Sequence, residues 1–136
     1  MTEIGVEIFE NDFMRLKWSN GIIMGTYKRG PITLEMAKQV VQNRLKFANY
    51  VPSPIMINDI GLRSIDKDAR EYLSSDEGIQ GLTAGALVTD SAFGKHMANF
   101  FIRIAVIKPK IPTRIFSHEA EALEWLSQYV HVEKTT

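Results

Sequence analysis

The sequence predicts a single α/β domain built on a mixed β-sheet, and three patterns carry this prediction. Apolar residues alternate with polar ones near the N-terminus, which is typical of strands that bury one face. Apolar residues then recur at three- and four-residue steps over 34–48, which is typical of an amphipathic helix. Short apolar runs follow, separated by further helical patterns. Because alternating strands and helices imply parallel pairs joined by crossovers, the sheet should be partly parallel.

The N-terminal part is expected to contribute antiparallel strands. Residues 4–8 and 14–18 both alternate with a period of two, and a strand-like run continues over 22–27. Asn20-Gly21 lies between the last two runs. Because these residues tolerate the positive φ angles of a tight turn, we predict a hairpin over 13–28.

The period then changes to that of a helix. Thr33 is placed to cap the helix over 34–48, and Pro52 and Pro54 prevent the helix from continuing. The run 54–60 is short, apolar and bounded by residues that break secondary structure, so it suits a buried central strand.

Five further elements complete the domain. They are a short helix over 69–73, a buried strand over 84–90, a helix over 92–104, a strand over 113–116 and a final helix. Ser91 and Ser117 are placed to cap the last two helices. We therefore predict one domain over 1–132, with an N-terminal hairpin and about four helices, and a loose tail over 133–136.

The composition excludes several classes of function. Sixteen Lys and Arg balance sixteen Asp and Glu, which argues against general binding to nucleic acid. The chain has no cysteine and three histidines, so disulfides, cysteine-bound metals and a thiol nucleophile are excluded. No apolar run approaches the roughly 18 residues that span a bilayer, and the acidic N-terminus is unlike a signal peptide. We expect a cytoplasmic protein without a membrane span.

The order of elements resembles the STAS domain, the fold of bacterial anti-sigma-factor antagonists and of sulfate-transporter tails. The likeness is strongest over 55–69, where a buried strand ends in Asp and an acidic turn opens a helix. The ending, with a strand over 113–116 and Glu-Ala-Glu-Ala-Leu-Glu-Trp-Leu over 119–126, looks like a group of small bacterial STAS-like proteins of unclear function. The resemblance implies a STAS-like fold and a role in protein–protein contact.

One position departs from that family. In the antagonists the serine directly after the aspartate of this turn is phosphorylated, and the added charge releases the partner. Here Asp66 fits the aspartate, Lys67 stands at the acceptor position and Ala69 replaces a glycine. Because lysine cannot accept this phosphate, we expect the serine switch to be absent. Ser64, two residues before Asp66, is the alternative position at which a phosphate could be accepted.

The same turn is the predicted contact site for a partner. Its residues are Asp59, Ser64, Asp66, Lys67 and Asp68. The carboxylates of Asp59, Asp66 and Asp68 could instead hold a hard cation. We favour a simpler interpretation, in which Asp59 ends a strand while Asp66 and Asp68 cap a helix and complement its dipole, so no metal is predicted.

The predicted helix over 92–104 is apolar around more than half of its circumference. The residues responsible are Phe93, Met97, Phe100, Phe101 and Ile104. A helix that covers one face of a sheet needs an apolar stripe of only about 100°. Three interpretations of the additional apolar surface remain open: it is buried in a large core, it forms a homodimer interface, or it lines an apolar ligand pocket.

Catalytic signatures are missing from the sequence. It contains neither a Gly-x-Ser-x-Gly elbow nor a phosphate-binding glycine motif, so no catalytic residue and no cofactor are predicted. Two small basic clusters, Lys28-Arg29 and Lys108, Lys110 and Arg114, could hold an anion, although solvated loops explain them as well. The predicted function is a non-catalytic STAS-like module that binds a protein partner or itself. The alternative is a small carrier of an apolar or amphipathic ligand, since the lipid-binding CRAL-TRIO proteins share a comparable arrangement.

Overall fold

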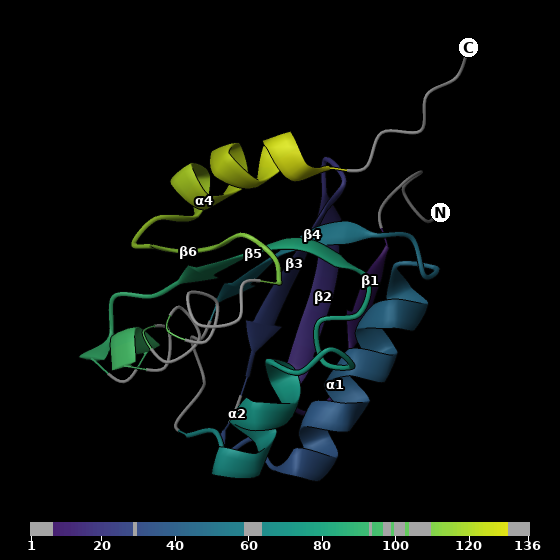
Figure 1. The fold of residues 1–136 in the computed structure, drawn as a ribbon. Helices are drawn as coiled ribbons and strands as arrows, with labels where there is room; N and C mark the ends of the chain where they lie inside the picture. Colours follow the sequence, from purple (N-terminus) through teal and green to yellow (C-terminus); the bar gives the residue numbers. More distant parts are fainter. Residues whose placement is uncertain are drawn as a thin grey trace.

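A mixed β-sheet with the strand order β1-β2-β3-β4-β5-β6 forms the middle layer of the molecule (Figure 1). The structure is a computed structural model, and it describes residues 7–28, 30–58, 64–92, 94–96, 99, 103 and 110–130. Its strands are β1 (Ile8–Glu10), β2 (Met14–Ser19), β3 (Ile22–Tyr27), β4 (Ser53–Asn58), β5 (Leu82–Val88) and β6 (Thr113–Phe116). The first three strands pair antiparallel, and the pairs from β3 to β6 are parallel. The predicted mixed sheet is therefore confirmed.

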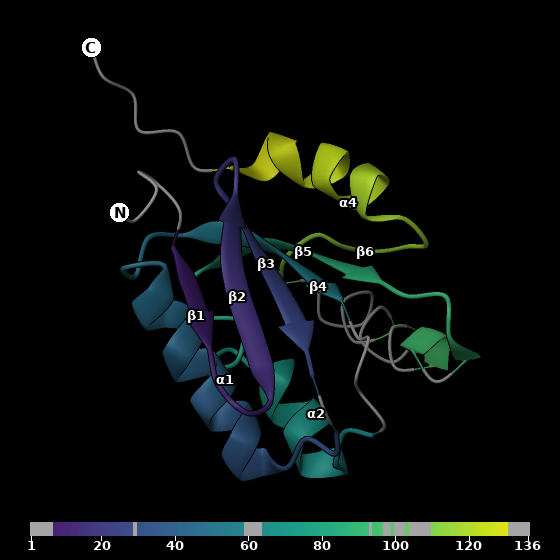
Figure 2. The same ribbon diagram turned by 180° about the vertical axis from the view of Figure 1, so that it is seen from behind.

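Helices cover both faces of the sheet. Helices α1 (Leu34–Phe47) and α2 (Lys67–Leu73) lie on one face, and α4 (Glu119–Leu126) lies on the other, as Figures 1 and 2 show. A 3-10 turn, η1 (Ser127–Tyr129), continues α4. Residues 92, 94–96, 99 and 103 are helical too, within the segment where a helix is predicted.

Two apolar layers hold the helices to the sheet. On the α1 and α2 side the core contains Met14, Leu16, Ile23, Tyr27, Ile32, Ala37, Val40, Ala48, Ile55, Ile65 and Ala69. On the α4 side it contains Ile22, Met56, Ala84, Ala86, Val88, Ala122 and Leu126. Neighbouring residues of β3 belong to opposite layers, because successive side chains of a strand point to opposite faces.

Two local signals in the N-terminal half are confirmed, whereas the strand predicted over 4–8 is found at Ile8–Glu10, with Glu7 outside it. Asn20 and Gly21 have φ angles of 49° and 84°, and they join β2 to β3 as predicted. The Met36 N–H donates to Thr33 Oγ1 at 3.2 Å, so Thr33 caps α1. The helix ends at Phe47, before the two prolines, because Asn49 and Tyr50 adopt left-handed φ angles of 54° and 61°.

The predicted cap of the last helix is wrong. Helix α4 begins at Glu119 and its N-cap is His118, whose side chain makes no capping hydrogen bond. Ser117 lies one residue too early to cap the helix. Glu119 and Glu121 place negative charge in the first turn and stabilise the dipole where a hydroxyl cap is missing. The predicted cap at Ser91 is confirmed, since the Gly94 N–H donates to its Oγ at 2.9 Å.

Candidate partner-binding site

The described part of the predicted contact turn, Ser64–Asp68, is held in place by backbone hydrogen bonds. The Ile32 N–H donates to the Ser64 carbonyl, and the Asp66 N–H donates to the Ile32 carbonyl, both at 2.9 Å. The side chains of Ile32 and Ile65 are buried in the core below this bridge. Since Ile32 directly precedes the cap of α1, the turn is fixed to the N-terminal ends of both α1 and α2.

The charged residues of the turn face solvent on this fixed backbone. Asp66, Lys67 and Asp68 are exposed, whereas Ser64 is half-buried. Arg70 supports the turn from one helical turn later, because its Nη1 donates to the Ile65 carbonyl at 2.9 Å. Asp66, Lys67 and Asp68 therefore form one short charged stretch of surface, with Ser64 half-buried beside it.

The capping role predicted for Asp66 is only partly correct. Asp66 occupies the N-cap position of α2, but its side chain makes no capping hydrogen bond. Its backbone N–H donates to the Ile32 carbonyl, so the residue contributes to the turn through its main chain. Asp68 lies in the first turn, where a carboxylate interacts favourably with the helix dipole.

Other predicted site residues lie outside the part of the chain that the structure describes. They are Asp59 of the turn and the apolar set Phe93, Met97, Phe100, Phe101 and Ile104. Among the described residues, no three acidic or histidine side chains are grouped closely enough to hold a metal ion. Within the same residues, no helix has the length and hydropathy needed to cross a bilayer.

A polar contact that the sequence did not indicate joins the carboxyl end of β4 to α4. The Asn58 Nδ2 donates to Glu119 Oε2 at 2.8 Å, across 61 residues of sequence. The parallel register brings Asn58 level with Thr26 of β3 and Val88 of β5. Open α/β sheets bind ligands at this edge. No local sequence pattern could have paired Asn58 with Glu119.

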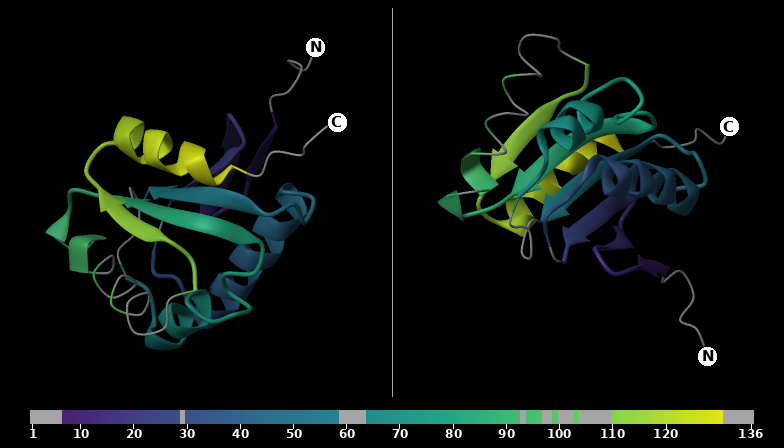
Figure 3. Two further views of the ribbon diagram at one scale, coloured as in Figure 1. Left: turned by 45° about the horizontal axis from the view of Figure 1, so that its top comes forward. Right: turned by 90° about the horizontal axis from the view of Figure 1, so that it is seen from below.

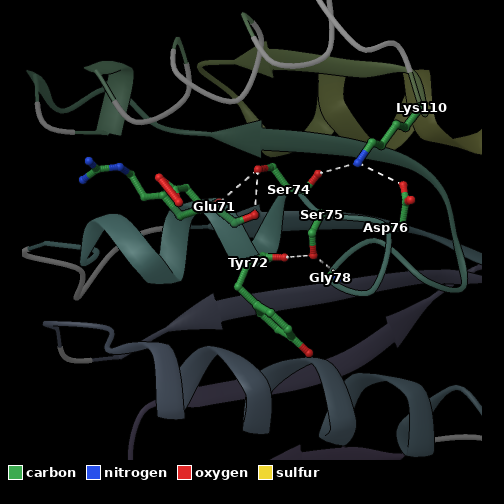
Figure 4. Close-up of polar contacts among 8 residues, drawn as sticks. Glu71, Tyr72, Ser74, Ser75, Asp76, Gly78 and Lys110 are labelled. Carbon is green, nitrogen blue, oxygen red and sulfur yellow. Dashed lines mark hydrogen bonds and ion pairs between the residues drawn. The ribbon is translucent and has the colours of Figure 1, made fainter.

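The loop between α2 and β5 is closed by a network of hydrogen bonds (Figure 4). Ser75 Oγ donates to the Tyr72 carbonyl and accepts the Gly78 N–H, while Ser74 Oγ donates to the carbonyls of Arg70 and Glu71. Lys110 reaches this loop from the segment before β6, where its Nζ donates to the Ser74 carbonyl at 3.2 Å. Lys110 also forms an ion pair with Asp76 at 3.0 Å.

The basic clusters are engaged with other parts of the chain. Lys110 binds the loop described above, and Lys28 forms an ion pair with Glu10. The Arg114 guanidinium lies over the rings of Phe116 and Trp125, with its Cζ at 5.3 and 5.6 Å from their centroids. Arg29 and Lys108 lie outside the described residues. These contacts favour structural roles for Lys28 and Lys110 over a shared anion site.

A buried cation lies between α1 and the α2–β5 loop. Arg44 is only 3% exposed, and its Nη2 donates to the Gly78 carbonyl at 3.1 Å. Burial lowers the pKa of Arg44 to about 10, so the guanidinium stays charged at neutral pH. Tyr27 is buried nearby, and burial raises the pKa of its phenol to about 12, against the opposing effect of the Arg44 charge.

Tyr27 makes a testable contribution to stability at alkaline pH. The folded protein keeps the phenol proton up to about pH 12, whereas the unfolded chain loses it near pH 10. The stabilisation is therefore complete below pH 10 and is lost as pH rises toward 12. We expect the wild type to lose about 2 to 3 kcal/mol more unfolding free energy than Tyr27→Phe over this range, as measured by urea unfolding. Parallel losses in the two proteins would contradict this expectation.

Comparison with known proteins supports the fold assignment. A solved structure described as an uncharacterized protein of the DUF3478 family with a SpoIIAA-like fold, from Shewanella loihica PV-4, matches with a TM-score of 0.59 and 15% identity. The match covers 90% of this chain and 94% of that one, so the fold is STAS-like, as predicted. None of the curated proteins matches the chain. A family model for a domain of unknown function, DUF7793, matches residues 14–130. The chain is therefore a member of the DUF7793 family.

Proposed function

We propose that this protein is a non-catalytic binding module that contacts a protein partner through the turn at Ser64–Asp68. The observation that carries the proposal is the exposure of Asp66, Lys67 and Asp68 on a backbone fixed by the Ile32–Ile65 bridge. A fixed backbone lowers the entropy that a surface loses on binding, so these charges are pre-organised for a partner. The STAS-like fold is consistent with such a role.

The pattern of charge suggests how specificity would arise. A single cation, Lys67, is flanked by two carboxylates on adjacent residues. A partner must then place an anion opposite Lys67 and cations opposite its neighbours. Reversing the central charge would put like charges face to face, which costs more than removing a contact. Specificity set by these three charges does not need a phosphorylated serine. This agrees with the presence of Lys67 where the anti-sigma-factor antagonists have the phosphorylated serine.

The substitution Lys67→Glu tests the proposal. We expect it to reduce recovery of the partner at least about tenfold when tagged protein is used for affinity purification from its own cells with quantitative mass spectrometry. Lys67 is the first residue of α2, so a carboxylate there interacts favourably with the helix dipole and should not lower the melting temperature. A loss of binding would then not reflect unfolding.

Lys17→Glu is the matched control. Lys17 is exposed on β2, at a sheet position remote from the turn, and the substitution makes the same change in charge. A protein that is retained by the wild type and by Lys17→Glu, but not by Lys67→Glu, would be a partner of the turn. If the three proteins recover the same set of proteins in the same amounts, the turn is not the binding site.

A further inference from the structure

Strand β6 forms one edge of the sheet and has an open hydrogen-bonding side within the described residues. It pairs with β5 alone, and Figure 3 (left) shows it at the near edge of the sheet beside α4. The carbonyls of Pro112 and Phe116 accept the N–H groups of Gly85 and Thr89. Because backbone groups alternate in direction along a strand, the N–H and C=O groups of Thr113 and Ile115 point away from β5.

Aromatic rings and an unpaired cation flank this open edge. Trp125 contacts Phe116 and Tyr129, with ring centroids 5.8 and 5.0 Å apart, and all three side chains are half-buried. Arg114 is exposed above two of these rings and forms no ion pair with the described residues. Tryptophan, tyrosine and arginine are the residues that most often dominate binding energy at protein interfaces.

A carboxylate of opposite charge lies on the same flank. Glu121 is exposed and precedes Trp125 by four residues, so it lies one turn away on the same side of α4. The flank therefore presents a cation on β6 and an anion on α4. A two-fold interface requires a surface that is complementary to itself, and this combination meets the requirement.

We propose that two copies of this chain associate through β6, with the strands antiparallel and paired about Thr113, so that the two Arg114 residues are not directly opposite each other and Arg114 of each copy faces Glu121 of the other. The formal net charge of zero means that like molecules do not repel each other strongly. The opposite edge of the sheet is a poorer candidate, because β1 is only three residues long and its Glu10 is already paired with Lys28. This interface is separate from the turn at Ser64–Asp68.

Charge reversal combined with sedimentation velocity tests the pairing. The wild type is expected to sediment as a dimer that dissociates on dilution. Arg114→Glu and Glu121→Arg should each raise the dimer dissociation constant at least about tenfold, because like charges then meet across the interface. The double variant Arg114→Glu/Glu121→Arg should return the dissociation constant close to that of the wild type. Lys17→Glu is the control and should leave dimerisation unchanged.

Thr113→Pro tests the strand contact independently of charge. Its N–H points away from β5, so proline removes an edge donor without breaking the β5–β6 ladder. We expect a folded monomer with a melting temperature close to that of the wild type. A monomeric wild type would overturn the proposal. A wild-type dimer that persists in Arg114→Glu, Glu121→Arg and Thr113→Pro would overturn it as well, by placing the contact elsewhere.

Discussion

Gly78→Ala is expected to lower the free energy of unfolding by about 3 to 5 kcal/mol, as measured by urea unfolding. Gly78 is buried in the α2–β5 loop, and a Cβ atom added there would lie 2.0 Å from the Tyr72 carbonyl oxygen and 2.8 Å from Leu73 backbone atoms. Both obstacles are backbone in the last turn of α2. No change of rotamer can relieve the clash, so the loop or the end of the helix must move.

Gly85→Ala is the control for this substitution. Gly85 lies within β5, and no described atom lies within 4 Å of a Cβ built on it. Alanine there should change stability by less than about 1 kcal/mol, since it also restricts the unfolded chain. If Gly78→Ala were as stable as Gly85→Ala, the close approach of the loop to α2 would be wrong.

The consequences of moving this loop extend beyond α2. The Gly78 N–H is bound by Ser75 and its carbonyl by Arg44, so displacement of one residue disturbs contacts with α1 as well. The N-terminal end of α2 carries the proposed contact turn. Weaker partner binding by Gly78→Ala than by Lys17→Glu, at a temperature where both are folded, would show that the position of α2 controls the turn.

Sequence patterns predicted the features of this fold that depend on neighbouring residues. The Asn20-Gly21 turn and the Thr33 cap each depend on a few consecutive residues, and both are present. The alternation in β2 and β3 identified the two buried faces, because a strand has a side-chain period of two. The turn before the short helix α2 also lies where the order of elements and the resemblance to STAS domains predicted it.

Features that depend on distant contacts could not be predicted in the same way. The helical spacing of α1 places Arg44 on the buried face with Ala37 and Val41. Its partner, the Gly78 carbonyl, lies 34 positions later in the sequence, and no local pattern indicates that contact. The pairing of Asn58 with Glu119 and the position of β6 at the sheet edge also depend on how the whole chain folds. The cap of α4 was misplaced because a serine near a helix start is only a local indication.

The second large effect is expected at Arg44, where alanine should lower the free energy of unfolding by about 2 to 4 kcal/mol. Arg44→Ala removes the buried stem and leaves the Gly78 carbonyl without its charged donor. Arg44→Met keeps most of the apolar volume and removes a buried cation whose lowered pKa reflects its loss of hydration. The methionine variant should therefore lose only about 1 to 2 kcal/mol.

Measuring the effect of Arg44→Ala in the wild type and in Gly78→Ala isolates the contribution of the contact between Arg44 and the Gly78 carbonyl. If Arg44 acts by holding the Gly78 carbonyl, Arg44→Ala should cost at least about 0.5 kcal/mol less when Gly78 has already been replaced by alanine, because the loop has then moved. Hydrogen exchange of the loop amides at 74–81 should increase in Arg44→Ala relative to those of β2, which is remote from the loop. Additive losses in the double variant, with unchanged exchange in the loop, would mean that Arg44 stabilises the fold through the packing of its stem and does not fix the loop.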